Sequence, residues 1–316
     1  MSDQTAGRTR AGFVAIVGAP NAGKSTLVNA LVGSKVSIVS PKVQTTRMRV
    51  IGIAMADLPG ESAAEGERAQ VVLVDTPGIF RIAKRRLERA MVAAAWQGAE
   101  DADVVALVID AERGVGEETR AIIERLKESK APRYLVLNKI DLVPREKLLT
   151  LTAEVNALLP FESVFMVSAL KNDGVADILK TVAARLPAGP FLYPEDQAAD
   201  LPLRLLAAEV TREQVFLQLH QELPYEAAVE TEKWEERKDG GVRIEQTIHV
   251  QREGQRAIVL GKGGAKIKQI GARARHELGQ MLERPVHLFL HVKVSERWAE
   301  DPSHYRTIGL DFEPKK

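Results

Sequence analysis

The sequence predicts an α/β domain, a doubly wound sheet with helices on both faces, followed by a smaller α+β domain. Short apolar, β-branched runs alternate with amphipathic segments as far as residue 186, which is typical of a largely parallel sheet. A proline-rich stretch at 187–202 then ends this alternation, and a different order of elements follows it. The length of 316 residues leaves room for about two such domains.

Five apolar runs are the expected strands of the first domain, and one more alternating run is an expected edge strand. The buried strands are predicted at 13–17, 71–75, 104–110, 134–138 and 164–168, and the edge strand at 47–55. Helical patterns lie between them, at 24–32, 86–96, 117–127, 145–158 and 175–186. We therefore expect residues 1–10 to be a disordered arm, 11–186 the first domain and 187–202 a linker.

The second domain is expected at 203–316, including a C-terminal tail. A helix at 203–223 precedes two strands, 227–237 and 242–251, which the turn "KDGG" joins into a hairpin. A glycine-rich stretch, a helix to about residue 282 and a strand at 286–294 complete it. His287 and His291 lie in that last strand without a carboxylate or cysteine at ligand spacing, so we expect them to be sheet residues.

Composition excludes several classes of protein. The absence of cysteine rules out disulfides and cysteine-based zinc or iron–sulfur sites, and it suits a reducing cytoplasm. The first ten residues lack the apolar segment of a secretory signal, and no run approaches the ~20 apolar residues of a spanning helix. A net charge of +1 means that any surface for nucleic acid must be local.

The segment "GAPNAGKST" contains the strongest motif. It matches G-x-x-x-x-G-K-[ST] and stands between an expected strand and an expected helix. Backbone N–H groups at a helix N-terminus can surround phosphates, Lys24 would reach the β- and γ-phosphates, and Ser25 would bind Mg²⁺. An accidental glycine turn is the alternative, and the match in this context argues against it. The expected phosphate loop comprises Gly18, Ala19, Pro20, Asn21, Ala22, Gly23, Lys24, Ser25 and Thr26.

Three further segments end apolar runs, so we expect them at the same edge of the sheet. In "DTPG", Asp75 can hold Mg²⁺ through water and the N–H of Gly78 can meet a γ-phosphate, although a simple turn is the alternative. In "NKID", Asp141 can accept two hydrogen bonds from guanine, a donor pair that adenine lacks. The backbone of "SAL" could meet the guanine carbonyl. These segments comprise Asp75, Thr76, Pro77, Gly78, Asn138, Lys139, Asp141, Ser168, Ala169 and Leu170.

The four loops resemble, in this order, those of the translation-factor-related class of P-loop GTPases. The resemblance implies GTP and GDP as ligands with Mg²⁺ bound by Ser25, Thr46 and Asp75, and it gives catalytic roles to Lys24, Thr46 and Gly78. It also makes "QTTR" the first switch, in which we favour Thr46 over Thr45 as the ligand of Mg²⁺. A loop before an edge strand is the alternative for this threonine pair.

One position departs from Ras-like GTPases. Their water-orienting glutamine follows the glycine of the "DTPG" segment, and here that position is Ile79. We therefore expect slow intrinsic hydrolysis, with the missing element supplied by a partner, a loop movement or a cation. In related GTPases without the glutamine, an asparagine at the position of Asn21 accompanies activation by K⁺. A role in shaping the loop is the equal alternative.

A second glycine loop, "GKGG", is followed by no Gly-Lys-Ser/Thr, and Lys266 stands where the first motif has its second glycine. A second nucleotide site is therefore not expected. The helix after it carries an apolar stripe at Ile267, Ile270, Ala274, Leu278 and Leu282. No acidic residue occurs between Arg256 and His276. The loop and its basic neighbours are Gly261, Lys262, Gly263, Gly264, Lys266, Lys268, Arg273 and Arg275.

A G-x-x-G turn between helices, in this order of elements, resembles a type-two KH domain. Such a turn clamps single-stranded nucleic acid by its backbone beside an apolar groove, which implies RNA binding by the loop and its basic neighbours. A helix–helix turn with a solvated basic face is the alternative.

The pairing of these two domains, with "QTTR", "DTPGIF", "NKID" and "GKGGAKIKQIG", closely resembles the Era family of bacterial ribosome-assembly GTPases. The resemblance covers residues 11–312. It implies binding near the 3′ end of 16S ribosomal RNA and a role in maturation of the 30S subunit. A cytoplasmic monomer with weak peripheral contact at the inner membrane, and no DNA ligand, is then expected.

The resemblance and the motifs together suggest a switch. GTP and Mg²⁺ would order the first switch and a second switch at 78–89, and hydrolysis would weaken RNA binding, with 187–202 as the hinge. Two alternatives stay open: a GTP-binding clamp without turnover, and a GTPase for a protein or membrane partner that uses the KH-like domain as a docking scaffold.

Overall fold

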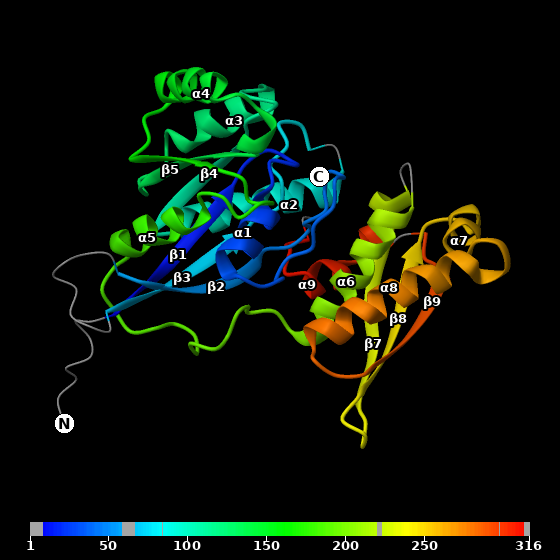
Figure 1. Cartoon of the computed structure of the whole chain (residues 1–316). Helices are drawn as coiled ribbons and strands as arrows, with labels where there is room; N and C mark the ends of the chain where they lie inside the picture. The colour runs from blue at the N-terminus through cyan, green and yellow to red at the C-terminus, as the bar shows by residue number, and fades with distance from the viewer. Residues whose placement is uncertain (1–8, 59–66, 84, 220–222, 297, 313–316) are drawn as a thin grey trace, which may run out of the picture. The chain divides into compact units, whose positions relative to one another are not determined.

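The computed structural model describes residues 9–58, 67–83, 85–219, 223–296 and 298–312 (Figure 1). The expected arm therefore lies outside the described residues up to residue 8, as do the last four residues of the expected tail and Lys84 of the second switch. The chain forms two compact units: Met1–Ser37 with Thr46–Asp200, and Ile38–Thr45 with Leu201–Lys316. Each unit is described by itself below.

The first unit contains a six-stranded sheet in the order β2-β3-β1-β4-β5-β6. All neighbouring strands are parallel except β2, which runs antiparallel to β3 at the edge, so the sheet is mixed. The strands span Thr9–Val17 (β1), Val50–Asp57 (β2), Arg68–Asp75 (β3), Val104–Asp110 (β4), Arg133–Asn138 (β5) and Ser163–Val167 (β6).

Helices cover both faces of this sheet, as the sequence predicts. They span Lys24–Val32 (α1), Arg86–Glu100 (α2), Glu117–Leu126 (α3), Arg145–Leu158 (α4) and Val175–Arg185 (α5). Because side chains alternate along a strand, Val14 and Ile16 of β1 pack with α1 and α5, while Ala15 and Val17 pack with α2, α3 and α4. The doubly wound architecture is confirmed, and the carboxyl ends of β1, β3, β4, β5 and β6 meet at one edge.

The first strand begins earlier than predicted. Thr9 and Arg10, which we expected in the disordered arm, pair in register with Arg68 and Ala69 of β3. Thr9 Oγ1 also donates to the carbonyl of Gly189 over 2.8 Å, and the Arg10 guanidinium donates to the carbonyl of Leu186 over 2.6 Å. Polar side chains at the start of a strand mask it in the hydrophobic pattern, although the backbone ladder continues through them.

The expected linker is also attached to the first unit, as far as Asp200. Its backbone forms isolated bridges to Arg10 and Gly52. The side chain of Gln70, fully buried on β3, accepts hydrogen bonds from the amides of Leu192 and Tyr193 and donates to the Tyr193 carbonyl, over 2.8–2.9 Å. The segment is therefore held to the sheet by isolated bridges and by the buried Gln70 side chain.

The second unit has the predicted order α6-β7-β8-α7-α8-β9, followed by a short helix, α9. The three-stranded sheet runs β7-β8-β9, with an antiparallel hairpin and a parallel third strand. Its elements span Leu203–Gln218 (α6), Ala228–Glu236 (β7), Val242–Val250 (β8), Glu253–Leu260 (α7), Ala265–Met281 (α8), Val286–Val294 (β9) and Pro302–Thr307 (α9). The core lies between α6, α8 and one face of the sheet.

Residues Ile38–Thr45 group with this second unit, whereas the sequence analysis placed them in the first domain, 11–186. Glu213 of α6 accepts a hydrogen bond from the amide of Val39 over 2.7 Å. Arg212 donates to the carbonyl of Thr45 over 2.5 Å and is paired with Glu209 in a buried position. These polar contacts join residues that are far apart in the sequence, so no local sequence pattern predicts the grouping.

Among the described residues, no helix combines the length and the apolar character needed to cross a bilayer.

We predict that Gln70→Ala releases the segment that follows α5. The substitution leaves two amides and a carbonyl without their buried partner, which costs about 1–3 kcal/mol. Hydrogen exchange at the amides of Leu192 and Tyr193 should accelerate by roughly 5- to 150-fold. Gln97→Ala is the control, since the exposed Gln97 side chain donates hydrogen bonds to its helical neighbour Asp101 and, within the described residues, none to the segment after α5. Unchanged exchange in Gln70→Ala would contradict the assignment.

Candidate functional sites

The phosphate loop connects β1 to α1 and is shaped by close backbone contacts. A Cβ on Gly18 would stand 2.4 Å from the carbonyl oxygen of Val108, and one on Gly23 would stand 2.2 Å from Nδ2 of Asn138. Gly23 also has a φ of 93° as the N-cap of α1 and places no capping side chain over its first turn. Glycine at both positions therefore leaves the helix N-terminus open to an anion.

Lys24 and Asp75 are buried charges at this loop. The Lys24 ammonium donates to the carbonyls of Gly18 and Ala19 over 3.1 and 2.9 Å, and burial lowers its pKa to about 8, although Asp75 opposes the shift. Burial raises the pKa of Asp75, against the hydrogen bond from Ser37 to Oδ2 over 2.7 Å. No hydrogen bond reaches Asp75 Oδ1 within the described part of the chain. A buried acceptor of this kind suits a water bound to Mg²⁺.

The two threonines of the expected first switch differ in their contacts. Thr46 Oγ1 lies 2.8 Å from Ser25 Oγ, so the two hydroxyls that we expected to bind Mg²⁺ are adjacent. Thr45 Oγ1 lies 2.6 Å from Ser40 Oγ and donates to the Lys42 carbonyl over 2.7 Å. The geometry therefore favours Thr46 over Thr45 as a ligand. Hydroxyl and carboxylate oxygens are the donors that Mg²⁺ prefers, so the group fits that ion.

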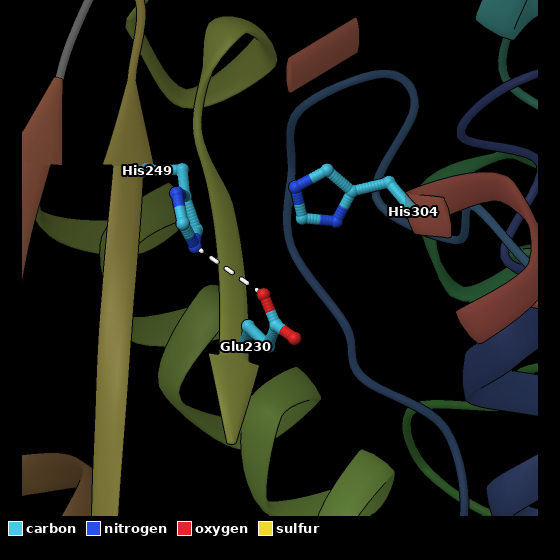
Figure 2. Close-up of side chains that lie close together, drawn as sticks. All are labelled: Glu230, His249 and His304. Atoms are coloured by element: carbon cyan, nitrogen blue, oxygen red, sulfur yellow. Dashed lines mark ion pairs between the residues drawn. The ribbon is translucent and has the colours of Figure 1, made fainter. Parts of the chain in front are cut away.

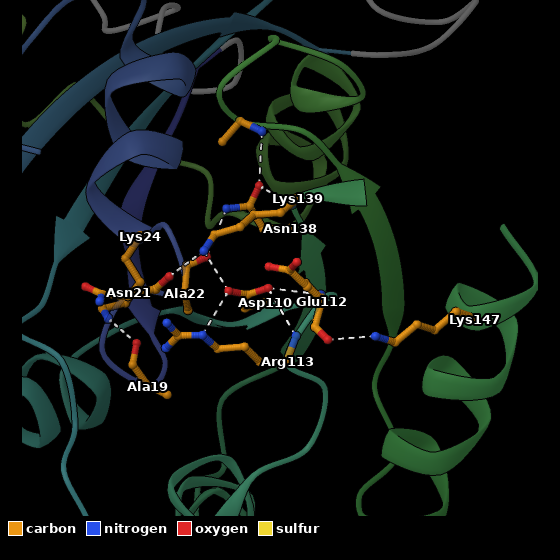
Figure 3. A network of polar contacts seen from close by, with 11 residues as sticks. Ala19, Asn21, Ala22, Lys24, Asp110, Glu112, Arg113, Asn138, Lys139 and Lys147 are labelled. Carbon is orange, nitrogen blue, oxygen red and sulfur yellow. Dashed lines mark hydrogen bonds and ion pairs between the residues drawn. The ribbon is translucent and has the colours of Figure 1, made fainter. Parts of the chain in front are cut away.

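Asn138, at the end of β5, joins three of the predicted loops (Figure 3). Its Nδ2 donates to the Ala22 carbonyl over 3.0 Å, and its Oδ1 accepts from the amides of Lys139 and Ala169 over 2.8 and 3.0 Å. The side chain is buried, with the residue 2% exposed. One carboxamide thus sets the positions of the phosphate loop, the "NKID" loop and the "SAL" loop.

Lys139 adds a second connection between the "NKID" loop and the phosphate loop. It also contacts Asp110, a residue that the sequence analysis missed. Lys139 has a φ of 65°, and its ammonium donates to the Asn21 carbonyl over 2.8 Å and to Asp110 Oδ2 over 2.6 Å (Figure 3). Asp110 is buried at the end of β4, where Oδ1 accepts from the amides of Glu112 and Arg113. An acid that ends an apolar strand is the same signal that identified Asp75.

Asp141 lies beside the "SAL" loop, as the base-recognition prediction requires. The hydroxyl of Ser168 is the main cause of the lowered pKa of the Asp141 carboxyl, with a contribution from Lys171, whose Nζ lies 3.3 Å from Oδ2. The carboxylate is therefore ionised and an acceptor at neutral pH. Leu170 is 82% exposed, so its side chain is not packed against the neighbouring loops.

Gly78 and Ile79 occupy contrasting positions. Gly78 touches the phosphate loop, since a Cβ there would lie 3.0 Å from Pro20. Thr76 is fully buried and donates to the Ile16 carbonyl over 2.7 Å, which anchors the "DTPG" segment to β1. The Ile79 side chain packs in the core with Ala15 and Val17. It therefore has neither the chemistry nor the position to orient water.

The glycine turn of the second unit is the other candidate site. Gly261–Gly264 connects α7 to α8, with positive φ at Gly261, Gly263 and Gly264. Lys262, Lys268, Arg273 and Arg275 are exposed, whereas Lys266 is half-buried and bonds Gln269 over 3.2 Å. Of the expected apolar stripe, Ile270, Ala274 and Leu278 are buried, and Ile267 and Leu282 are half-buried. Ile258 of α7, which the sequence analysis missed, is 57% exposed and adds an apolar surface beside the turn.

Two family descriptions match this chain. The 50S ribosome-binding GTPase family matches residues 13–139, and the KH domain family matches residues 222–299. These ranges contain the phosphate loop and the G-x-x-G turn, respectively.

Relatives match over the full length. GTPase Era of Afipia carboxidovorans is 58% identical over 100% of this chain and 99% of the relative. GTPase Era of Bradyrhizobium diazoefficiens is 56% identical over 100% and 98%. Two solved structures are each 41% identical, with a TM-score of 0.87 over 95% of this chain and 99% of theirs: Aquifex aeolicus Era Y63A bound to GDP.AlF4⁻, and Era in complex with MgGDPNP and nucleotides 1506–1542 of 16S ribosomal RNA.

We predict that Asn138→Ala loosens the three loops together. The loss of buried hydrogen bonds should lower the free energy of unfolding of the first unit by about 2–3 kcal/mol and weaken GDP binding at least tenfold. Thermal unfolding and titration with GDP measure the two effects. Asn156→Ala, a half-buried position on α4, is the matched control and should change neither. Wild-type stability and GDP affinity in Asn138→Ala would show that the carboxamide does not organise the site.

Proposed function

This chain belongs to the Era family of GTPases, and from this membership we propose that it is a GTP-driven switch that binds 16S ribosomal RNA near its 3′ end and assists maturation of the 30S subunit. The observation that carries the proposal is the presence, in one chain, of a phosphate loop with a buried lysine and of a basic glycine turn with exposed lysines and arginines. The related structure with MgGDPNP and 16S nucleotides supports the same pairing of ligands.

We assign the nucleotide contacts by the positions of the loops. Residues 18–26 would surround the phosphates, with Lys24 neutralising the β- and γ-phosphates. Ser25 and Thr46 would bind Mg²⁺ directly and Asp75 through water, and the bound ion would supply charge neutralisation. The Gly78 amide would meet the γ-phosphate. Asp141 would accept the two guanine donors, and the "SAL" backbone would meet the guanine carbonyl, which together select GTP over ATP.

Because Ile79 stands where Ras-like GTPases have a glutamine, another group must orient the attacking water during GTP hydrolysis. The Ile79 side chain is buried, so it cannot take this role. We propose K⁺ as the cation that fills this role at Asn21, a residue of the phosphate loop with a φ of 62°. A partner that supplies the group is the competing proposal.

GTP hydrolysis should therefore be faster in K⁺ than in Na⁺ buffer of equal ionic strength, on the order of tenfold, or ~1.4 kcal/mol of activation free energy. Asn21→Gly is the informative variant, because glycine keeps the positive φ and removes the carboxamide. It should hydrolyse GTP at the Na⁺ rate in both buffers while retaining GDP affinity. Equal wild-type rates in K⁺ and Na⁺ would reject the potassium proposal.

RNA binding is assigned to the turn at Gly261–Gly264 and to the lysines and arginines around it. The turn exposes its backbone to a sugar–phosphate chain, and Lys262, Lys266, Lys268, Arg273 and Arg275 supply charge without an acid between Arg256 and His276.

Coupling to the nucleotide would run through the first switch: Thr46 touches Ser25, and the preceding residues Ile38–Thr45 are bonded to α6. GTP that orders Thr46 would then bias the second unit. We propose this segment, in place of residues 187–202, as the coupling element.

We predict that a 16S fragment binds more tightly with a non-hydrolysable GTP analogue than with GDP, by roughly 5- to 150-fold. Linkage requires the RNA to raise affinity for the analogue by the same factor. Gly263→Asp should weaken RNA binding in both states, since Asp tolerates the φ of 60° and adds a negative charge at the turn. Gly240→Asp, at a φ of 77° in the β7–β8 hairpin, is the matched control.

Equal RNA affinity with GDP and the analogue would reject the switch. Equal RNA affinity of Gly263→Asp and Gly240→Asp would reject the RNA site and favour the docking-scaffold alternative. Cross-linking in cells, mapped to Lys262 or Lys266, identifies the RNA.

A further inference from the structure

Three side chains of the types that can bind a metal ion meet on the second unit (Figure 2). Glu230 comes from β7, His249 from β8 and His304 from α9. One ligand atom of each lies within 4.8 Å of the others. Ile248 and Val250 face the core, so His249 between them points to the opposite face of the sheet.

His249 is oriented as a metal ligand would be. Its Nδ1 lies 3.0 Å from Ser295 Oγ, and when Nδ1 donates to that hydroxyl, Nε2 carries a lone pair. Nε2 points at Glu230 Oε2 over 3.4 Å, and among the described residues no hydrogen bond reaches it. The side chain is 9% exposed. A buried imidazole nitrogen with an oriented ring and no hydrogen bond is an open coordination position.

Burial disfavours the protonated form of His249. Burial is the main cause of its lowered pKa, and His304 and Lys293 add to the effect, while Glu230 and Glu232 oppose it. A neutral imidazole is the form that binds a metal ion.

His304 is held in place by its own surroundings. Its ring packs edge-to-face on Trp298 with centroids 5.7 Å apart, and on His249 at 5.3 Å. Asp301 caps α9 by accepting hydrogen bonds from the amide and hydroxyl of Ser303 over 2.9 and 2.7 Å. Trp298 Nε1 in turn donates to the Glu226 carbonyl over 2.9 Å. The ring therefore reaches the cluster from an anchored segment.

We propose that Glu230, His249 and His304 form a site for a divalent metal ion of the Zn²⁺ type, which ties α9 to the outer face of the three-stranded sheet. Two donors on a tetrahedral Zn²⁺ lie about 3.4 Å apart, given bonds of about 2.0–2.1 Å. The Glu230–His249 separation already has this value, at 3.4 Å. Glu230 is exposed and His304 half-buried, so side-chain rotations can shorten the two remaining distances, from His304 to Glu230 and to His249. Two imidazoles select against Mg²⁺ and Ca²⁺, and solvent completes the coordination.

The test titrates the full chain, stripped with chelator and saturated with Mg²⁺–GDP, with Co²⁺ and then with Zn²⁺ as competitor. We expect one equivalent of Co²⁺ with visible d–d absorption, displaced by Zn²⁺, and slower hydrogen exchange in α9 when Zn²⁺ is bound. His304→Ala should weaken Zn²⁺ binding by more than about 100-fold, and Ser295→Ala by about 10-fold, as for loss of an outer-shell partner.

His291→Ala removes an exposed histidine of β9 outside the cluster and should bind Zn²⁺ like the wild type. Equal Zn²⁺ affinity in His304→Ala and His291→Ala would overturn the proposal, as would the absence of a Co²⁺ equivalent beyond Mg²⁺–GDP. Either result would reduce the cluster to an ion pair between Glu230 and His249. Because buried His249 contributes to folding, His304→Ala carries the test, and its thermal unfolding without metal confirms that it is folded.

Discussion

The carboxamide of Asn138 is the interaction on which the nucleotide site depends. A single buried side chain satisfies one carbonyl of the phosphate loop and two amides from the loops after β5 and β6. These loops are far apart in the sequence and meet only because parallel strands bring their carboxyl ends to one edge. The same contact explains Gly23, because any Cβ there would collide with the Asn138 amide. The loops proposed for base recognition and for phosphate binding are thus held together by one residue.

The two buried ionisable groups at this edge, Lys24 and Asp75, respond to burial in the same way. Lys24 and Asp75 are both desolvated, and burial shifts each pKa toward the neutral form. A phosphate beside Lys24 and a metal ion beside Asp75 would each favour the charged form again. This edge of the sheet therefore carries two desolvated groups, each of which a bound ligand would stabilise in its charged form. The Lys24 ammonium meanwhile bonds to the carbonyls of its own loop, which is the best partner that the chain itself offers.

Local patterns in the sequence were enough to predict the doubly wound sheet, the order of elements in the second unit and the loops of the candidate site. Hydrophobic period and glycine position carry that information within a few residues. The sequence analysis missed or misplaced features that depend on contacts between polar groups far apart in the sequence. Gln70 attaches the proline-rich stretch to the sheet, Arg212 draws Thr45 to α6, and Glu230, His249 and His304 meet across three elements. Nothing in the spacing of such residues marks the contact, since their neighbours in sequence are ordinary strand and helix residues.

Two glycine loops of similar composition have different surroundings, which suit the different ligands that we propose for them. The loop at Gly18 lies against the Val108 carbonyl, and its lysine is buried, so it can enclose the compact phosphates of one nucleotide. A Cβ on Gly263 or Gly264 would meet nothing within 4 Å, and Lys262 is exposed. Such a turn cannot enclose a ligand, but it can lie along an extended chain and contact one phosphate after another. Burial, more than the glycines themselves, separates a nucleotide site from a surface for single-stranded RNA.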